Sequence, residues 1–145
     1  MIYPLKNWET AKRGYKFGQK TFYSLHHLGV DHIVPEGTPI YAPIDCEIIF
    51  SGAGIQGGNT IWAKFSDEQF GILIMRFMHL KKMMTRGKYK EGDIIGYTGN
   101  TGKFTNGAHL HTDISLQKVQ INSFKNFIDP EKYFLERVKN KIPKK

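Results

Sequence analysis

Residues 92–114 of the chain read GDIIGYTGNTGKFTNGAHLHTDI. Glycines and small polar residues recur through this stretch, which closes on two histidines, His109 and His111, on either side of Leu110. In a β-strand the side chains at positions i and i+2 leave from the same face, so both imidazoles would point into one space. The spacing therefore predicts a metal site carried by a strand, in which either histidine could be the ligand.

A second group of the same character lies upstream, in the segment His27-Leu28-Gly29-Val30-Asp31. It offers an imidazole and a carboxylate close together around a flexible glycine. Two nitrogens and one oxygen are the ligand set of a catalytic zinc ion, with a fourth position left for water. His79, in a Phe-Met-His-Leu context, adds another histidine, whereas we interpret His26 and His32 as bystanders that spacing alone could not exclude.

The region from Gly18 to Leu116, about two-thirds of the chain, resembles the lysostaphin/LytM-type zinc metallopeptidases. The family pattern begins H-x-G-x-D, continues through P-x-G-T-P-[VI]-x-A, G-N and an aromatic-x-H-L, and closes with G-x-x-I-G-x-x-G-x-T-G-x-x-T-x-G-x-H-L-H. The matching residues are, in order, His27, Gly29, Asp31, Pro35, Gly37, Thr38, Pro39, Ile40, Ala42, Gly58, Asn59, Phe77, His79, Leu80, Gly92, Ile95, Gly96, Gly99, Thr101, Gly102, Thr105, Gly107, His109, Leu110 and His111.

The resemblance implies a role for each histidine of the pattern. The zinc ligands of the family fall on His27, Asp31 and His111, with one zinc ion per chain, and its catalytic histidines fall on His79 and His109. Many members also carry a tyrosine ahead of the first ligand that helps to hold the oxyanion, and Tyr23 is the nearby candidate.

Three positions depart from the family pattern without removing a ligand. Cys46 stands where glycine is usual, His32 where an aromatic residue is usual, and Thr112 where Phe or Tyr is usual. We expect these changes to reshape the walls of the groove, and so to affect substrate preference more than catalysis. Cys46 is the single cysteine and cannot form an internal disulfide, so we also expect it to be a small apolar core residue.

The chemistry follows from the ligand set. Zinc held by two neutral histidines and a carboxylate lowers the pKa of its water to about 7 and polarises a scissile carbonyl. One nearby histidine can take the proton of that water, and a second can bind the oxyanion or steer the water. We favour His109 as the base because it shares a strand face with His111, and the reverse assignment with His79 stays open. Asp113, on the same face, could orient a ligand ring or be an ordinary polar strand residue.

The sequence predicts a mainly β fold: one domain over residues 1–145, an antiparallel sheet with a catalytic groove, and a short C-terminal helix. The core would span about residues 18–116 and the helix about residues 130–141. Asp129 can cap this helix and Pro130 suits its first turn. Segments rich in β-branched and aromatic residues predict strands at 39–41, 47–51, 60–65, 71–79, 94–98 and 108–116.

The net charge of +8 is the main global signal of the composition. Basic residues concentrate in the acid-free segment 81–90 and in the tail 139–145. Such a balance suits a polyanionic partner, namely nucleic acid, anionic lipid or the anionic polymers of a bacterial wall, whereas for the tail we favour a simple solvated segment. No motif for nucleic-acid binding accompanies these basic residues. The chain has no apolar run long enough to span a membrane and no signal-peptide pattern at its start. It also shows no heptad repeat and no unused apolar stripe, so we expect a monomer.

The resemblance points to bacterial peptidoglycan as the substrate, with hydrolysis of peptide bonds in its stems or cross-bridges. A compact basic enzyme without a leader would suit a bacteriophage endolysin or a virion-associated lysin. Three alternatives remain: a non-catalytic regulatory module of the same fold, a zinc peptidase that acts on a non-wall protein, and a sugar-phosphotransferase carrier domain with a related glycine-rich β-architecture.

Overall fold

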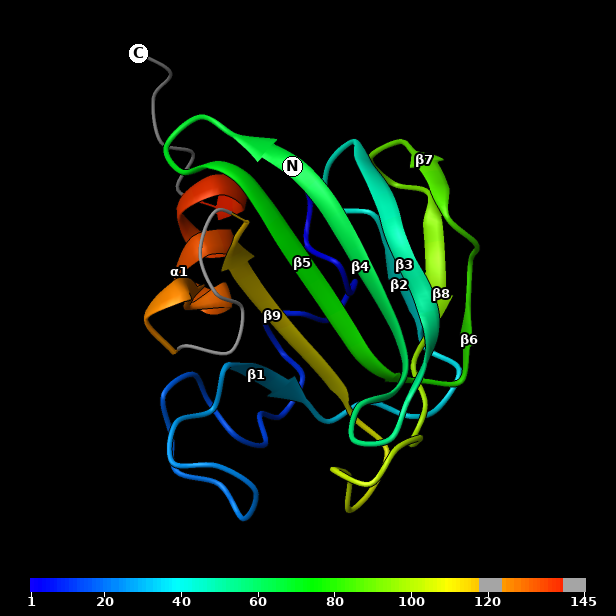
Figure 1. Cartoon of the computed structure of the whole chain (residues 1–145). Coiled ribbons are helices and arrows are strands. Elements are labelled where there is room, and N and C mark those ends of the chain that lie inside the picture. The colour runs from blue at the N-terminus through cyan, green and yellow to red at the C-terminus, as the bar shows by residue number, and fades with distance from the viewer. Residues whose placement is uncertain (118–123, 140–145) are drawn as a thin grey trace.

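The computed structural model describes residues 1–117 and 124–139, and within them two antiparallel sheets. The larger, seven-stranded sheet has the order β1-β9-β5-β4-β3-β7, with β10 paired to β9 (Figure 1). The smaller sheet has the order β2-β8-β6. The strands are β1 Gly29–His32, β2 Pro39–Tyr41, β3 Cys46–Gly54, β4 Gly58–Asp67, β5 Gly71–Leu80, β6 Lys82–Met83, β7 Gly87–Tyr89, β8 Ile94–Tyr97, β9 Leu110–Leu116 and β10 Phe127–Ile128.

The central strands β4 and β5 have one apolar face and one mixed face. Along β5, Leu73, Met75 and Phe77 are fully buried in the core, whereas Arg76 and Met78 point to the opposite side. This alternation is the period-2 pattern of a strand with one packed face. It leaves the second face of the sheet free to form the floor of a cleft.

The N-terminal segment completes the sheet beside β1. Leu5 and Trp8 are buried in the core. The Gly14 N–H donates to the Asp31 carbonyl oxygen at 2.9 Å, and the Asp31 N–H donates to the Tyr15 carbonyl oxygen at 2.9 Å. Residues ahead of the matched region therefore hold β1 from its outer side, a role that the sequence interpretation did not foresee.

All six predicted strands are present, and the mainly β architecture is confirmed. β3, β4 and β5 are longer than predicted, β2 has the predicted bounds, and β8 and β9 are slightly shorter. The strands β1, β6, β7 and β10, two to four residues long, were not predicted. Such short segments carry little periodic signal. No helix within the described ranges is both long and apolar enough to cross a membrane.

The predicted C-terminal helix begins as expected and then changes character. Its α-helical part, α1, covers Pro130–Phe134, and Asp129 caps it by accepting a hydrogen bond from the Glu131 N–H at 3.0 Å. It continues as a π-helical turn, η2, over Leu135–Lys139, and a 3-10 turn, η1, at Phe124–Asn126 precedes β10. Residues 140–141 of the predicted helix and residues 140–145 of the basic tail lie outside the described ranges.

Helix α1 packs on the sheet and is fastened by a polar cluster. Tyr133 and Phe134 are buried. The Tyr133 hydroxyl donates to Asp67 Oδ1 at 2.6 Å, and Arg137 Nε donates to the same oxygen at 2.9 Å. Burial by itself would raise the pKa of Asp67, but these hydrogen bonds outweigh it and hold the pKa below its usual range.

Cys46 is buried in the core, as predicted for a small apolar residue. Burial is the main cause that raises the pKa of its thiol to about 11, so the thiol stays protonated at neutral pH.

Candidate metal centre and catalytic cleft

The pairing of β1 with β9 brings the two sequence motifs together. In this register Asp31 lies opposite His111, and Gly29 lies opposite Asp113. A Cβ atom on Gly29 would fall 2.0 Å from the Thr112 carbonyl oxygen and 2.8 Å from Asp113 Cβ. The glycine of the first motif is therefore required for β9 to approach β1 closely enough to align the two donors.

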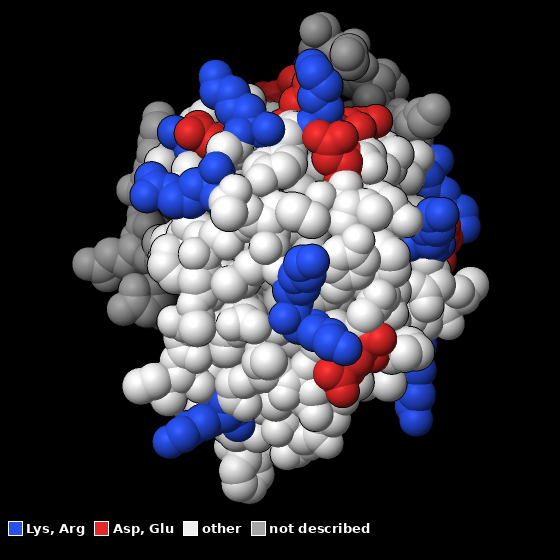
Figure 2. Space-filling model, turned by 90° about the vertical axis from the view of Figure 1, so that its right-hand side faces the viewer, with Lys and Arg blue, Asp and Glu red and all other residues white. Residues whose placement is uncertain are grey.

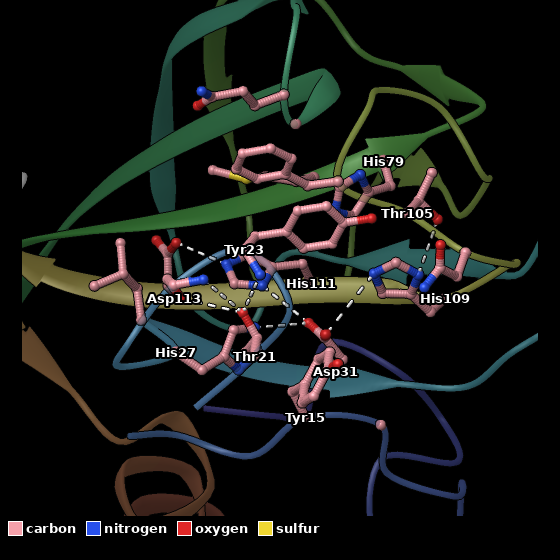
Figure 3. Close-up of a pocket in the computed structure, with 18 of the residues that line it drawn as sticks. Tyr15, Thr21, Tyr23, His27, Asp31, His79, Thr105, His109, His111 and Asp113 are labelled. Carbon is pink, nitrogen blue, oxygen red and sulfur yellow. Dashed lines mark hydrogen bonds and ion pairs between the residues drawn. The ribbon is translucent and has the colours of Figure 1, made fainter. Parts of the chain in front are cut away.

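His27, Asp31 and His111 form a compact donor group, in which one ligand atom from each lies within 4.8 Å of the others. Asp31 Oδ1 is 3.3 Å from His27 Nε2 and 2.9 Å from His111 Nδ1. All three residues are buried. Figure 3 shows the two imidazoles and the carboxylate converging from β1, β9 and the loop before β1.

The second ring nitrogen of each histidine donor has its own acceptor. His27 Nδ1 is 3.3 Å from the Lys16 carbonyl oxygen, and His111 Nε2 is 2.9 Å from Asp113 Oδ2. A carbonyl or carboxylate on one nitrogen fixes the tautomer that leaves a lone pair on the other. In this tautomer both rings would offer an unprotonated nitrogen, His27 Nε2 and His111 Nδ1, to a metal ion beside Asp31.

The electrostatics of the group also fit a cation. Burial by itself would lower the pKa of His111, but Asp113 and Asp31 on its two nitrogens raise it to about 9. Burial opposes the charge of Asp31, and hydrogen bonds from His111 and His27 outweigh burial and lower its pKa. A buried site that stabilises positive charge between two nitrogens and a carboxylate has the donor chemistry of a zinc site.

His79 and His109 lie beside the donors, with their ring centroids 4.6 Å apart. His79 Nδ1 donates to the Thr101 carbonyl oxygen at 2.8 Å, and His109 Nδ1 donates to the Gly107 carbonyl oxygen at 2.8 Å. Each ring thereby turns Nε2 away from its backbone partner, and His109 Nε2 lies 3.9 Å from Asp31 Oδ2. Burial is the main cause that lowers the pKa of His79 to about 4, so this ring is neutral at neutral pH.

The backbone at these histidines is unusual. His79 has a φ of 65°, and no other non-glycine residue of the described ranges has a positive φ. Held left-handed conformations at non-glycine residues cluster at functional sites. His109 lies just before β9, in an isolated bridge to Gly99, so it keeps the extended backbone that points it into the same space as His111.

These side chains line a cleft of about 1060 Å³. Its floor is the open face of β4, β5 and β9, and its walls come from the loop before β1, the β3–β4 turn and the loop before β9. Tyr23, the candidate for an oxyanion-binding tyrosine, lines the cleft and stacks on Phe104 of the loop before β9, with centroids 4.3 Å apart. Tyr15 is a second phenol in the cleft that the sequence interpretation missed, because only the folded loop brings it near His27.

The two histidines taken as bystanders stay outside the donor group. His26 stacks on Phe124, with centroids 4.8 Å apart. His32 is fully buried against Trp8 and bonds the Trp8 carbonyl oxygen through Nε2 at 3.1 Å.

The expectation that Cys46, His32 and Thr112 reshape the groove walls is wrong. All three are buried, and none lines the cleft. Thr112 lies between His111 and Asp113 on β9, so the alternation of the strand turns it to the opposite face.

Comparisons with known proteins agree with this geometry. Residues 25–123 match the model of peptidase family M23. The chain is 37% identical over 109 residues to an uncharacterized metalloprotease of Buchnera aphidicola, covering 74% of this chain and 28% of that protein. It is 36% identical over 123 residues to lysostaphin of Staphylococcus staphylolyticus, covering 79% of this chain and 23% of that protein.

The fold agrees as well. The catalytic domain of lysostaphin from Staphylococcus simulans superimposes with a TM-score of 0.74 at 29% identity, covering 88% of this chain and 95% of that domain. The family match covers the donor group and both further histidines, and it decides against a phosphocarrier domain. This chain belongs to peptidase family M23.

Proposed function

We propose that this chain is a zinc-dependent endopeptidase that hydrolyses peptide bonds in the stems or cross-bridges of bacterial peptidoglycan. The observation that carries the proposal is the convergence of His27, Asp31 and His111 in a cleft that also holds two further histidines. A relative from Neisseria meningitidis, a DD-carboxypeptidase/endopeptidase, shares 31% identity over 111 residues, and a DD-endopeptidase of Vibrio cholerae acting on peptidoglycan shares 32% over 98 residues.

His27 Nε2, Asp31 Oδ1 and His111 Nδ1 would hold the metal. When bound, zinc lowers the pKa of its water to about 7 and polarises the carbonyl of the bond to be cut. The second ring nitrogens of His27 and His111 are turned away from the centre, toward the Lys16 carbonyl oxygen and Asp113, whereas Asp31 Oδ2 faces His109 Nε2 at 3.9 Å.

His109 is assigned as the general base. Its Nδ1–H is held by the Gly107 carbonyl oxygen, so Nε2 carries a lone pair and faces Asp31 of the donor group. This nitrogen takes the proton of the attacking water and returns it to the departing amine.

His79 is assigned to steering the water. With Nδ1–H donated to Thr101 and the ring neutral, its Nε2 can only accept a hydrogen bond. As an acceptor beside His109, His79 can orient the second hydrogen of the attacking water. It cannot bind the oxyanion, because the oxyanion needs a hydrogen-bond donor. The phenol of Tyr23, which Figure 3 shows reaching over the donor group from the loop before β1, can supply that donor.

The substrate assignment agrees with the composition of the cleft. Among the residues that the structure describes, its lining carries no lysine, and the charged groups Asp31, Arg76 and Asp113 pair with histidines or with each other. An extended, uncharged stretch of peptide is the substrate that such a lining accepts. The basic residues of the segment 81–90 lie outside this lining and are exposed around β6 and β7.

Figure 2 shows the face of the molecule on the side of β6 and β7. Its Lys and Arg side chains stand apart, with Asp and Glu between them. Contact of this face with anionic wall polymers stays a prediction, as does a bacteriophage origin of the enzyme. The chain spans about a quarter of the length of the first curated relatives, so the activity of a whole protein is part of the proposal.

The proposal is tested by the release of new amino termini from purified peptidoglycan by the zinc-loaded protein. We expect release from the intact site and none from His111→Ala or after treatment with a chelator. His26→Ala is the matched control, since His26 is a neighbouring histidine outside the cleft, and it should act like the wild type. Stoichiometric zinc without amine release from walls of several cross-bridge types would point instead to a regulatory module or another substrate.

A further inference from the structure

A line of side chains runs across the sheet from the donor group to Arg76. Asp113 accepts the Nε2–H of His111 through Oδ2 at 2.9 Å. The same carboxylate receives two bonds from Arg76, from Nε to Oδ1 at 2.8 Å and from Nη2 to Oδ2 at 2.8 Å. Asp113 and Arg76 are register partners on β9 and β5, so the backbone pairing itself brings them together.

Arg76 is itself held in place. Its guanidinium lies 5.8 Å from the ring of Trp62, its register partner on β4, and 5.5 Å from the ring of Phe127 on β10. Its side chain is 13% exposed, and Asp113 is fully buried. A planar fork between two aromatic rings keeps one orientation, and a bidentate pair transmits that orientation to the carboxylate.

The geometry has a consequence for His111. The ring can direct Nδ1 at the metal position only while its Nε2–H is held on the far side, and Asp113 provides that hold. If only the imidazole held it, the Asp113 carboxylate could rotate about χ2, because this torsion has no narrow energy minimum. The guanidinium fork fixes the plane of the carboxylate and thus the direction of the ring.

We propose that Arg76 is a positioning residue of the metal centre, which acts on the ligand His111 through Asp113 and is braced by Trp62 and Phe127. The inference rests on the proposed metal site and not on the identity of the substrate. It involves no contact between Arg76 and the metal.

The test is the dissociation constant for zinc, measured on the full chain by competition with a chromogenic chelator, without any substrate. We expect Asp113→Asn and Arg76→Gln each to weaken zinc binding by about 10- to 100-fold. The matched control is Arg137→Gln, which removes a guanidinium that also binds an aspartate in two places and lies 3.9 Å from an aromatic ring, Tyr133. It should lower the melting temperature and leave zinc affinity unchanged.

A double variant separates positioning from general loss of structure. If Arg76 acts through Asp113, Arg76→Gln combined with Asp113→Asn should bind zinc as weakly as Asp113→Asn alone. The visible spectrum of the cobalt-substituted protein should shift in the same variants and not in Arg137→Gln. Additive losses of affinity, or wild-type affinity in Arg76→Gln, would overturn the inference.

Arg76→Lys covers the case in which Arg76→Gln does not fold. It keeps the charge and loses the fork, so weaker zinc binding with an unchanged circular dichroism spectrum supports positioning, and full affinity refutes it. A wild-type chain that binds no zinc refutes both this inference and the proposed function. Zinc binding with the expected pattern but no amine release refutes only the proposed peptidase activity.

Discussion

The floor and the rim of the cleft are built in different ways. On the floor, Asp31 and His111 are held by strand pairing between β1 and β9, and both are buried. On the rim, the loop before β1 exposes 84% of Phe22 and 72% of Leu25, and the β3–β4 turn exposes 74% of Ile55. Strand register fixes the positions of Asp31 and His111, whereas the exposed parts of the rim loops, away from the ligand His27 at the end of the loop before β1, can change in sequence without moving these two donors. We infer that the floor determines the chemistry and the rim selects the bond.

His109→Ala is the change expected to have the largest effect on the chemistry next to the donor group. It removes the base and leaves His27, Asp31 and His111 in place, so zinc should stay bound while kcat for amine release falls by about 10²- to 10⁴-fold. Zinc content and amine release are measured on the same sample, with His26→Ala as the control. Loss of zinc from His109→Ala would mean that this histidine is a ligand.

Gly99→Ala tests how tightly the floor is joined to the loop that carries His109. A Cβ atom on Gly99 would lie 2.5 Å from the Lys81 backbone nitrogen and 2.8 Å from the His79 carbonyl oxygen. Both are backbone atoms, so the clash could be relieved only by moving the main chain. We expect a loss of unfolding free energy of about 1–3 kcal/mol and a lower activity, because His79 and His109 both border this contact.

Gly54→Ala is the matched control for Gly99→Ala, since a Cβ atom there would meet nothing within 4 Å. Denaturant unfolding and amine release are compared for the two variants. Equal stability and activity in both would show that the close approach at Gly99 is not needed.

Phe104→Ala tests the rim. It removes the ring that stacks on Tyr23 across the cleft, a pair worth about 0.5–1.5 kcal/mol. We expect unchanged zinc affinity and a change of about 2- to 10-fold in the relative rates on walls with different cross-bridges, measured by the mass of the released fragments. If the rate fell equally on all walls, Phe104 would affect the chemistry and not the choice of bond, and the proposed difference between floor and rim would be wrong.

Asp67→Asn tests a contact that lies outside both the floor and the rim of the cleft. The carboxylate ties α1 and η2 to the end of β4 through Tyr133 and Arg137, so its neutralisation should lower the unfolding free energy by about 1.5–3 kcal/mol. Because the folded-state pKa is depressed, this contribution is present above the unfolded value of 3.8 and is lost as pH falls through the lower folded value.

Unfolding of Asp67→Asn and the wild type should therefore differ at pH 7, begin to converge below the unfolded pKa of 3.8, and become equal only below the lower folded-state pKa. Zinc affinity at pH 7 should be the same for both proteins. A weakened metal site in Asp67→Asn would show that the helix end and the cleft are coupled.

The sequence was enough to predict the longer strands and the residues of the donor group. The segments rich in β-branched and aromatic residues predicted β4 and β5, and Asp129-Pro130 predicted the start of α1. The short strand β1 was not predicted, although it carries Asp31, because its four residues are all buried and show no alternation. Arg76 and Tyr15 were missed, since nothing in their local sequence marks them and only strand register or loop folding brings them to the site.

By itself, the sequence determined the chemistry of the site: two histidines spaced by one residue, an H-x-G-x-D segment and a further histidine, whose donor atoms suit zinc. Only the tertiary structure decided which nitrogen of each ring faces the centre, which residues hold the ligands from behind, and which departures from the family lie in the core. The physical reason is that donor identity is a property of each side chain, whereas tautomer, orientation and burial depend on partners tens of residues away in the chain.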